Sequence, residues 1–140
     1  MLIGAINAAA ARRRITRLFR PHAERTAWAA GPMTEADWST SRSIGFLTGA
    51  INTTVAQDNL EGLFSVQLGV WEDLTSCAPD LFATRLYLLS SEGDRDMLEG
   101  YAAGTCFANA LLSNQQDVAH ATWDTNVMCI SLTNDYGLLG

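Results

Sequence analysis

The first 25 residues constrain this chain most, because they carry a charge opposite to that of the rest. They hold six arginines against a single acid, Glu24, for a formal net charge of +5. Residues 26–140 hold three arginines against fourteen acids, for a net charge of −11. A basic N-terminal segment that leads into an acidic body is typical of proteins that act through contacts with other macromolecules.

The basic segment has the pattern of an amphipathic helix. Placed at helical spacing, its small and apolar residues share one stripe about 100° wide; they are Gly4, Ala8, Ala11, Ile15, Leu18 and Phe19. The arginines lie on the opposite side or flank it. The alanine run favours helix, and arginine is nearly as good a helix former. Pro21 cannot continue a helix easily and disfavours helical geometry at Arg20, which predicts a helix over about 2–19.

Four roles fit such a helix. Its apolar stripe could pack on the body of the same chain and leave the arginines in solvent. It could dock on an acidic partner, including a neighbouring copy of the same chain. It could contact nucleic-acid phosphates, which would make binding salt-dependent. An Arg-rich amphipathic N-terminus is also found in organellar transit peptides and interfacial helices.

The length and cysteine content narrow the class of protein. A chain of 140 residues predicts one domain. No apolar run approaches the roughly 18 residues that span a bilayer, and the order of apolar and basic residues is not that of a secretory signal. Cys77, Cys106 and Cys129 form no CxxC pair, which favours a reducing compartment. All formal cations are arginine, a coding bias seen in some bacteria and their phages. We therefore expect a cytoplasmic or virus-particle protein.

Residues 21–33 are predicted to be a linker, in which Trp28 is either an intermolecular anchor or packed within the chain. Thr34 fits a helix N-cap. Apolar residues at helical spacing then favour a helix over about 35–57, although the many Ser, Thr and Gly residues leave a strand open. Gly45 and Gly49 in this segment are spaced for close helix contact.

The remainder is predicted to be mixed α and β. Alternating or apolar segments favour strands at Leu63–Trp71, Leu81–Leu89 and Val127–Leu132. Asp94 fits an N-cap for a helix over about 95–113, whose apolar positions are Leu98, Tyr101, Ala102, Thr105, Ala108, Leu111 and Leu112. The expected fold class is α+β, with a small antiparallel sheet. It comprises a basic helical arm (1–20), a linker (21–33) and an acidic body (34–140).

Few residues suggest chemistry. Asp117, His120 and Asp124 would share a helix face, as a general base or partial metal site requires. The only other histidine, His22, lies in the arm, and a structural metal site needs about four ligands. No nucleotide-binding, metalloprotease or hydrolase motif is present. We expect no catalytic residue, no metal and no cofactor.

The sequence thus favours a non-enzymatic structural or assembly protein, a protomer of a multi-subunit particle such as a virion. The expected contact residues are Arg12, Arg13, Arg14, Arg17, Arg20, Ile15, Leu18, Phe19 and Trp28. The expected partner is another copy, another subunit or nucleic acid. One alternative is a free-standing acidic module that sequesters a basic partner. Another is a small enzyme that uses His120.

Overall fold

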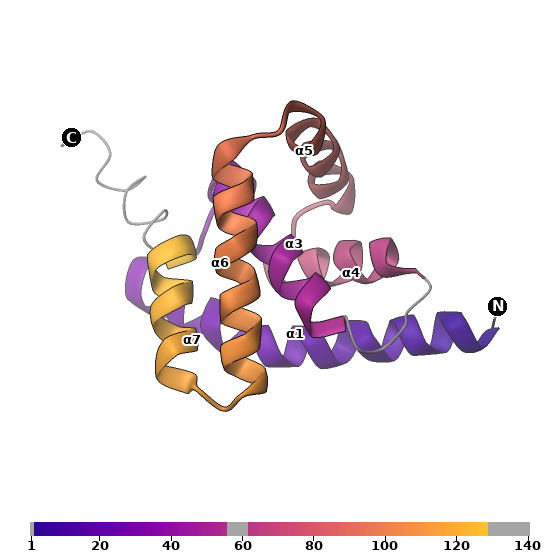
Figure 1. The fold of residues 1–140 in the computed structure, drawn as a ribbon, viewed down its shortest axis with the longest axis horizontal. Coiled ribbons are helices and arrows are strands. Elements are labelled where there is room, and N and C mark those ends of the chain that lie inside the picture. Colours follow the sequence, from indigo (N-terminus) through magenta and orange to yellow (C-terminus); the bar gives the residue numbers. More distant parts are fainter. Residues whose placement is uncertain (1, 56–61, 129–140) are drawn as a thin grey trace.

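A computed structural model describes residues 2–55 and 62–128, which are 87% helical (Figure 1). The elements are α1 (Leu2–Ala30), α2 (Glu35–Trp38), α3 (Ser41–Val55), α4 (Leu63–Thr75), α5 (Pro79–Glu92), α6 (Arg95–Leu112), α7 (Gln116–Trp123) and a π-helical turn, η1 (Asp124–Met128). Helices α3 and α6 pack together in the middle. Helix α1 lies across one end of the molecule beside α4, and α7 covers the outer side of α6.

The expected α+β fold is wrong, because the described residues contain no strand. Residues predicted as the first two strands form α4 and α5. In α4 the buried residues Val66, Gln67, Val70 and Trp71 recur at helical spacing, whereas Phe64 of the predicted alternation is 53% exposed. Short apolar runs fit a buried helix face as well as a strand, and here the helix prevails. Of the third predicted strand, 127–128 belong to η1 and the rest lies outside the described residues.

Two predicted helical segments are confirmed, one of them with a break. The segment predicted as a single helix over 35–57 forms two helices, α2 and α3, which are interrupted at Ser39 and Thr40, and its last two residues lie outside the described chain. Thr34 caps α2 with a capping box, in which its hydroxyl accepts from Asp37 N and the Asp37 carboxylate accepts from Thr34 N. The helix predicted over 95–113 is α6, and the Asp94 carboxylate accepts a hydrogen bond from Met97 N at 2.9 Å.

Interlocked glycines allow α3 and α6 to touch backbone to backbone. A Cβ added to Gly45 or Gly49 of α3 would lie within 2.2 Å of a carbonyl oxygen of α6. A Cβ added to Gly100 or Gly104 of α6 would lie within 2.3 Å of a carbonyl oxygen of α3. The close helix contact predicted for Gly45 and Gly49 is therefore confirmed, with α6 as the partner.

This glycine contact also changes which side of α6 is buried. The apolar positions expected to face the core included Leu98 and Tyr101, which are 56% and 37% exposed. The buried side instead carries the two glycines together with Met97 and Phe107. Glycine adds almost no apolar surface, so a pattern based on hydrophobic residues misses a face that packs through its backbone.

An aromatic cluster joins the four central helices. The Phe107 ring of α6 lies 5.4 Å from Phe19 of α1, 5.2 Å from Phe46 of α3 and 5.4 Å from Trp123 of α7, between ring centroids. All four rings are fully buried. Aromatic side chains bury large areas and contribute more when their rings meet edge to face, so this cluster fixes α1 to the rest of the core.

The predicted end of the first helix at Phe19 is wrong, because α1 continues through Pro21 to Ala30. Proline within a helix removes one backbone hydrogen bond and costs about 3 kcal/mol. On either side of Pro21, however, Phe19 and His22 are buried in the core, and so is Thr26 one turn later. Beyond Pro21, the His22 ring packs against Phe107 and Trp123, and the Thr26 hydroxyl accepts a hydrogen bond from the Trp123 indole, so tertiary contacts hold this part of the chain in the helix.

The Gly104→Ala substitution tests the glycine contact by the sign of its effect. Helix propensity alone predicts that alanine stabilises an α-helix by about 1 kcal/mol. The new Cβ would instead lie 2.0 Å from the Phe46 carbonyl oxygen, so we expect destabilisation of at least about 1–3 kcal/mol in chemical denaturation. The control Ala102→Ser, at an exposed site of the same helix, should change stability by less than about 0.5 kcal/mol. A more stable Gly104→Ala protein would contradict the close approach.

Candidate functional site

The basic segment is held on the body by a two-point ion pair between α1 and α4. Arg12 Nε donates to Asp73 Oδ2 at 2.8 Å, and Arg12 Nη2 donates to Asp73 Oδ1 at 2.7 Å. Nη2 also lies 3.3 Å from Glu72 Oε1. Parallel hydrogen bonds between a guanidinium and a carboxylate are among the strongest polar contacts in proteins. Arg12 is therefore engaged within the chain.

Gly69 makes room for this ion pair, and Thr16 adds a hydrogen bond to it. A Cβ on Gly69 would lie 2.4 Å from Arg12 Cδ, so the arginine crosses α4 over a glycine one turn before Asp73. The Thr16 hydroxyl donates a further bond to Asp73 Oδ2 at 3.1 Å. The hydrogen bond from Arg12, supported by that from Thr16, lowers the pKa of Asp73 below its ordinary value. Hydrogen bonding to Asp73 likewise raises the pKa of Arg12.

A second ion pair fixes the other half of α1. Arg25 Nη1 donates to Asp124 Oδ2 at 2.9 Å, which ties α1 to η1. Beside it, the Trp123 indole N–H donates to Thr26 Oγ1 at 2.8 Å. The N-terminal helix is thus a structural member of the fold along its length from Arg12 to Thr26.

His22 lies buried at this junction, only 3% exposed. Its ring packs edge-on against Phe107, at 4.9 Å between centroids, and against His120, at 5.1 Å. Burial, with smaller electrostatic contributions from the neighbouring His120 and Arg25, lowers the pKa of His22 to about 4. His22 is therefore neutral in the folded protein near pH 7.

The alternative acid–histidine group of Asp117, His120 and Asp124 does not form a possible metal site among the described residues. His120 packs against His22, and Asp124 forms its ion pair with Arg25. Within residues 2–55 and 62–128, no three His, Cys, Asp or Glu side chains gather in a way that could hold a metal ion. Cys77 is half-buried and Cys106 exposed, and both are free thiols; Cys129 lies outside the described residues.

The apolar seam predicted for a partner is mostly used within the chain. Ile15 and Phe19 are fully buried in the core, whereas Leu18 is 36% exposed. A partner could reach the first two only if α1 left the body. Leu18 is the one member of the predicted seam that remains accessible.

The other predicted contact residues are at the surface. Arg13 and Arg17 are exposed and form no ion pair within the part of the chain that the structure describes. Arg14 is exposed as well and is engaged by another group. Trp28 is 91% exposed, an unusual position for a tryptophan. It lies on α1, not in the linker that the sequence predicted.

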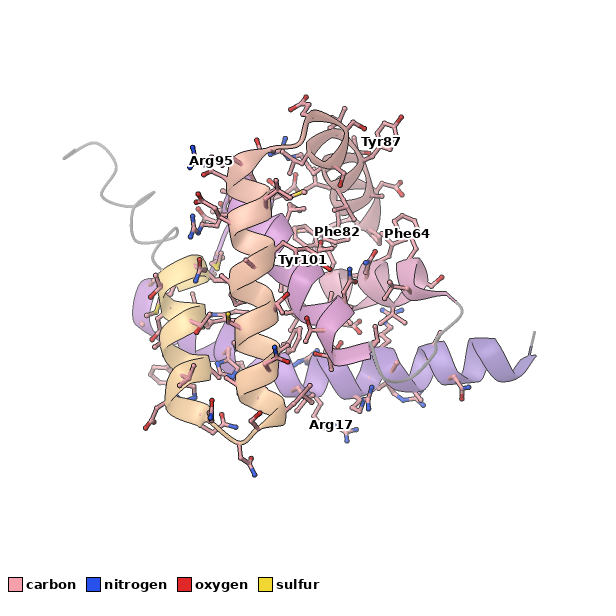
Figure 2. All side chains as sticks on the ribbon, viewed as in Figure 1. Arg17, Phe64, Phe82, Tyr87, Arg95 and Tyr101 are labelled. Atoms are coloured by element: carbon pink, nitrogen blue, oxygen red, sulfur yellow. The ribbon has the colours of Figure 1, made fainter. Side chains whose placement is uncertain are left out.

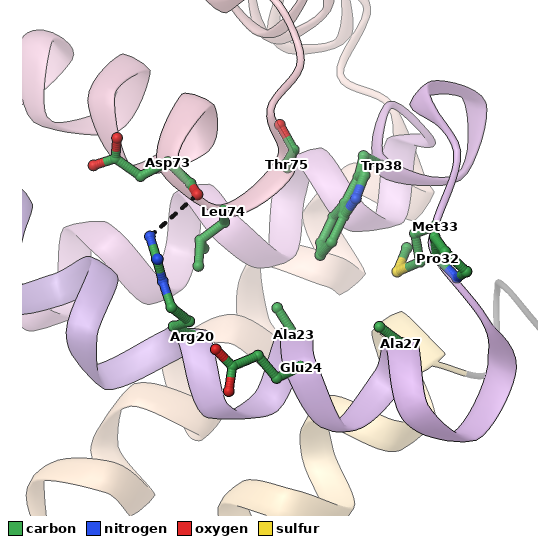
Figure 3. A pocket seen from close by; sticks show the side chains of 10 residues that line it. All are labelled: Arg20, Ala23, Glu24, Ala27, Pro32, Met33, Trp38, Asp73, Leu74 and Thr75. Atoms are coloured by element: carbon green, nitrogen blue, oxygen red, sulfur yellow. Dashed lines mark hydrogen bonds between the residues drawn. The ribbon is translucent and has the colours of Figure 1, made fainter.

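A groove runs along α1 beside these residues. Its first part, a hollow of about 500 Å³, is lined by Arg13, Thr16, Arg17, Arg20, Pro21, Glu24 and Asp73. Its second part, of about 320 Å³, is lined by Arg20, Ala23, Glu24, Ala27, Pro32, Met33, Trp38, Asp73, Leu74 and Thr75 (Figure 3). The two parts share Arg20, Glu24 and Asp73 and therefore adjoin one another. We call this hollow the α1 groove and regard it as the candidate site.

Sequence reasoning found the arginines of this site but missed Gly69, Asp73 and the apolar lining. Asp73 follows the segment predicted as the first strand, and it lies 61 positions from Arg12. Patterns of neighbouring residues carry no information about an ion pair between residues so far apart in the sequence. The only available signal was the excess of acids in the body, which predicts that some of them face the arginines without saying which.

The Arg12–Asp73 pair can be measured with a double-mutant cycle of Arg12→Ala and Asp73→Ala. We expect a coupling of roughly 1 kcal/mol in denaturant unfolding, because the geometry is two-point but both side chains are partly exposed. The coupling should fall at high salt. Additive single effects would show that the pair does not form in solution. Arg95→Ala with Glu99→Ala, an exposed i,i+4 pair, gives the reference for a weak contact, about 0.3–0.5 kcal/mol.

Stability should depend on pH through His22. Its pKa is lower in the folded state than in the unfolded chain, so below about pH 6.5 only the unfolded chain takes up the proton. The free energy of unfolding should therefore fall by up to about 3 kcal/mol from pH 6.5 to 4. His22→Leu should flatten this part of the profile, whereas the exposed His120→Gln should largely keep it. An equal slope in the His22→Leu protein would contradict a buried neutral His22.

None of the described helices combines the length and the apolar character that crossing a bilayer requires. Comparison of the chain with protein-family models, with curated proteins and with solved structures gave no match in any of the three.

Proposed function

We propose that this protein is a non-enzymatic assembly protein, a protomer that docks its basic α1 surface on an acidic surface of a neighbouring subunit. The observation that carries the proposal is the pair of exposed arginines, Arg13 and Arg17, which form no ion pair within residues 2–55 and 62–128, whereas several other arginines pair with acids of the body. Arg12 and Arg25 pair with acids of the body, and Arg42 pairs with Glu99 and donates to Asn126. Cations left free on a rigid helix are available to a partner.

Trp28 supports the same surface. It follows Arg17 by eleven residues, which is three helical turns, so both side chains leave α1 on nearly the same side roughly 16 Å apart. Arginine and tryptophan are the residue types most enriched among those that dominate binding energy at protein interfaces. An exposed tryptophan in line with free arginines therefore favours a protein partner.

The charge of the chain supports a neighbouring copy as that partner. Residues 26–140 carry a net charge of −11, against +5 for the first 25. A partner whose surface is acidic is thus present wherever a second copy is. A contact between different surfaces of two copies is heterologous, and it builds rings or open arrays when it repeats. A particle component, including a virion protein, is one form of such an assembly.

The mass of the purified protein at low and high salt tests this function. We expect a species of several copies at low salt that dissociates as salt rises, because screening weakens contacts between exposed charges. Arg13→Glu with Arg17→Glu should leave a monomer at every salt concentration, and Trp28→Ala should shift the equilibrium in the same direction. Arg95→Glu is the matched control, since Arg95 lies far from Arg17 at the opposite end of the molecule (Figure 2). A wild-type monomer at low salt would overturn self-assembly.

A further inference from the structure

The α1 groove changes character along its length. The part near Arg13 and Arg17 is bordered by cations, whereas the part beyond Arg20 is lined mainly by the apolar groups of Ala27, Met33, Trp38 and others (Figure 3). The groove therefore has a basic end and an apolar end. A surface that only attracted negative charge would not need an apolar end.

The charge at the basic end is a true excess. Three arginines line the groove against two acids, but Asp73 is already neutralised by Arg12 through two hydrogen bonds. Glu24 is then the one acid that opposes Arg13, Arg17 and Arg20. The basic end of the groove can therefore accept about two carboxylates.

Arg20 lies at the junction of the two ends. Its Nη2 donates to the Asp73 backbone oxygen at 3.3 Å, a long bond that leaves most of the guanidinium open (Figure 3). The apolar end beyond it is built by three different parts of the fold: the second half of α1, the segment from Pro32 to Trp38, and the end of α4. This end exists because α1 continues past Pro21.

We propose that the α1 groove binds a peptide segment of the partner in which acidic residues are joined to apolar ones. The acidic residues would pair with Arg13, Arg17 and Arg20, and the apolar side chains would cover the exposed Ala27 and the partly exposed Met33. From Arg13 to Ala27 the helix rises roughly 21 Å, the length of about six extended residues. This inference rests on the proposed function and specifies the partner chemistry that the same surface selects.

Charge complementarity favours this occupant over nucleic acid. Phosphates would satisfy the arginines, but they would leave the apolar end without a counterpart. A segment that carries both chemistries uses the whole groove, and burying apolar surface contributes roughly 25 cal/mol per Å². The two halves of such a segment also fix the direction in which it lies, because only one direction places acids at Arg17 and apolar groups at Met33.

A fluorescence-anisotropy experiment tests the proposal with the full-length protein. The probes are a labelled peptide Asp-Glu-Asp-Gly-Leu-Leu-Phe, the same sequence reversed, an all-acidic peptide of equal length and a seven-nucleotide oligo-dT. We expect one order of the mixed peptide to bind at least tenfold more tightly than the all-acidic peptide and the oligo-dT. Equal binding of the all-acidic peptide, or of the oligo-dT, would overturn the proposal in favour of a purely electrostatic or nucleic-acid contact.

Matched variants separate the two ends of the groove. Ala27→Glu places charge and bulk in the apolar end and should weaken the mixed peptide at least tenfold. Ala29→Glu makes the same change at an exposed site of α1 that does not line the groove, and should leave binding unchanged. Equal effects of these two variants would overturn the inference. If Arg13→Glu with Arg17→Glu abolishes assembly while Ala27→Glu does not affect peptide binding, the proposed function stands and the groove specificity fails.

Discussion

The backbone contact between α3 and α6 is the constraint on which the other helices depend. Four glycines, two from each helix, bring the pair so close that no Cβ fits between them. This central pair carries Phe46 and Phe107, the rings around which α1 and α7 pack through Phe19 and Trp123. An interior with so little spare volume responds strongly to small changes in size. The glycines set the distance between α3 and α6, and that distance places the rings on which α1 packs.

The N-terminal helix is both a structural member and a carrier of charge. Its inner side is held by the aromatic cluster and by the ion pairs of Arg12 and Arg25. Holding the helix in this way fixes the outer arginines relative to the end of α4 and to the segment around Trp38. A free arm would present the same charges without a shaped apolar surface beside them. Because binding that orders a segment costs free energy, a fixed surface favours affinity as well as selectivity.

Folding the basic segment back also divides its arginines into two groups. Those that face the acidic body are neutralised, as Arg12 is by Asp73, and they contribute to the fold. Arg13 and Arg17 are exposed and form no ion pair with the residues that the structure describes. Ion pairs within one chain thus neutralise only part of the positive charge of the basic segment. The remaining charge, together with the exposed Trp28, is what the proposed assembly uses.

The sequence by itself determined the helical character of residues 2–19, the caps at Thr34 and Asp94, the helices that follow them, and the close contact expected of Gly45 and Gly49. These features depend on local propensities and spacings, which neighbouring residues carry. The tertiary structure alone decided that residues 63–71 and 81–89 are helices, that α1 passes through Pro21, and that Arg12 meets Asp73. Each of these outcomes depends on burial or pairing between distant segments. The helix passes through Pro21 because His22 and Thr26 make core contacts beyond it, and only the folded chain brings their partners together.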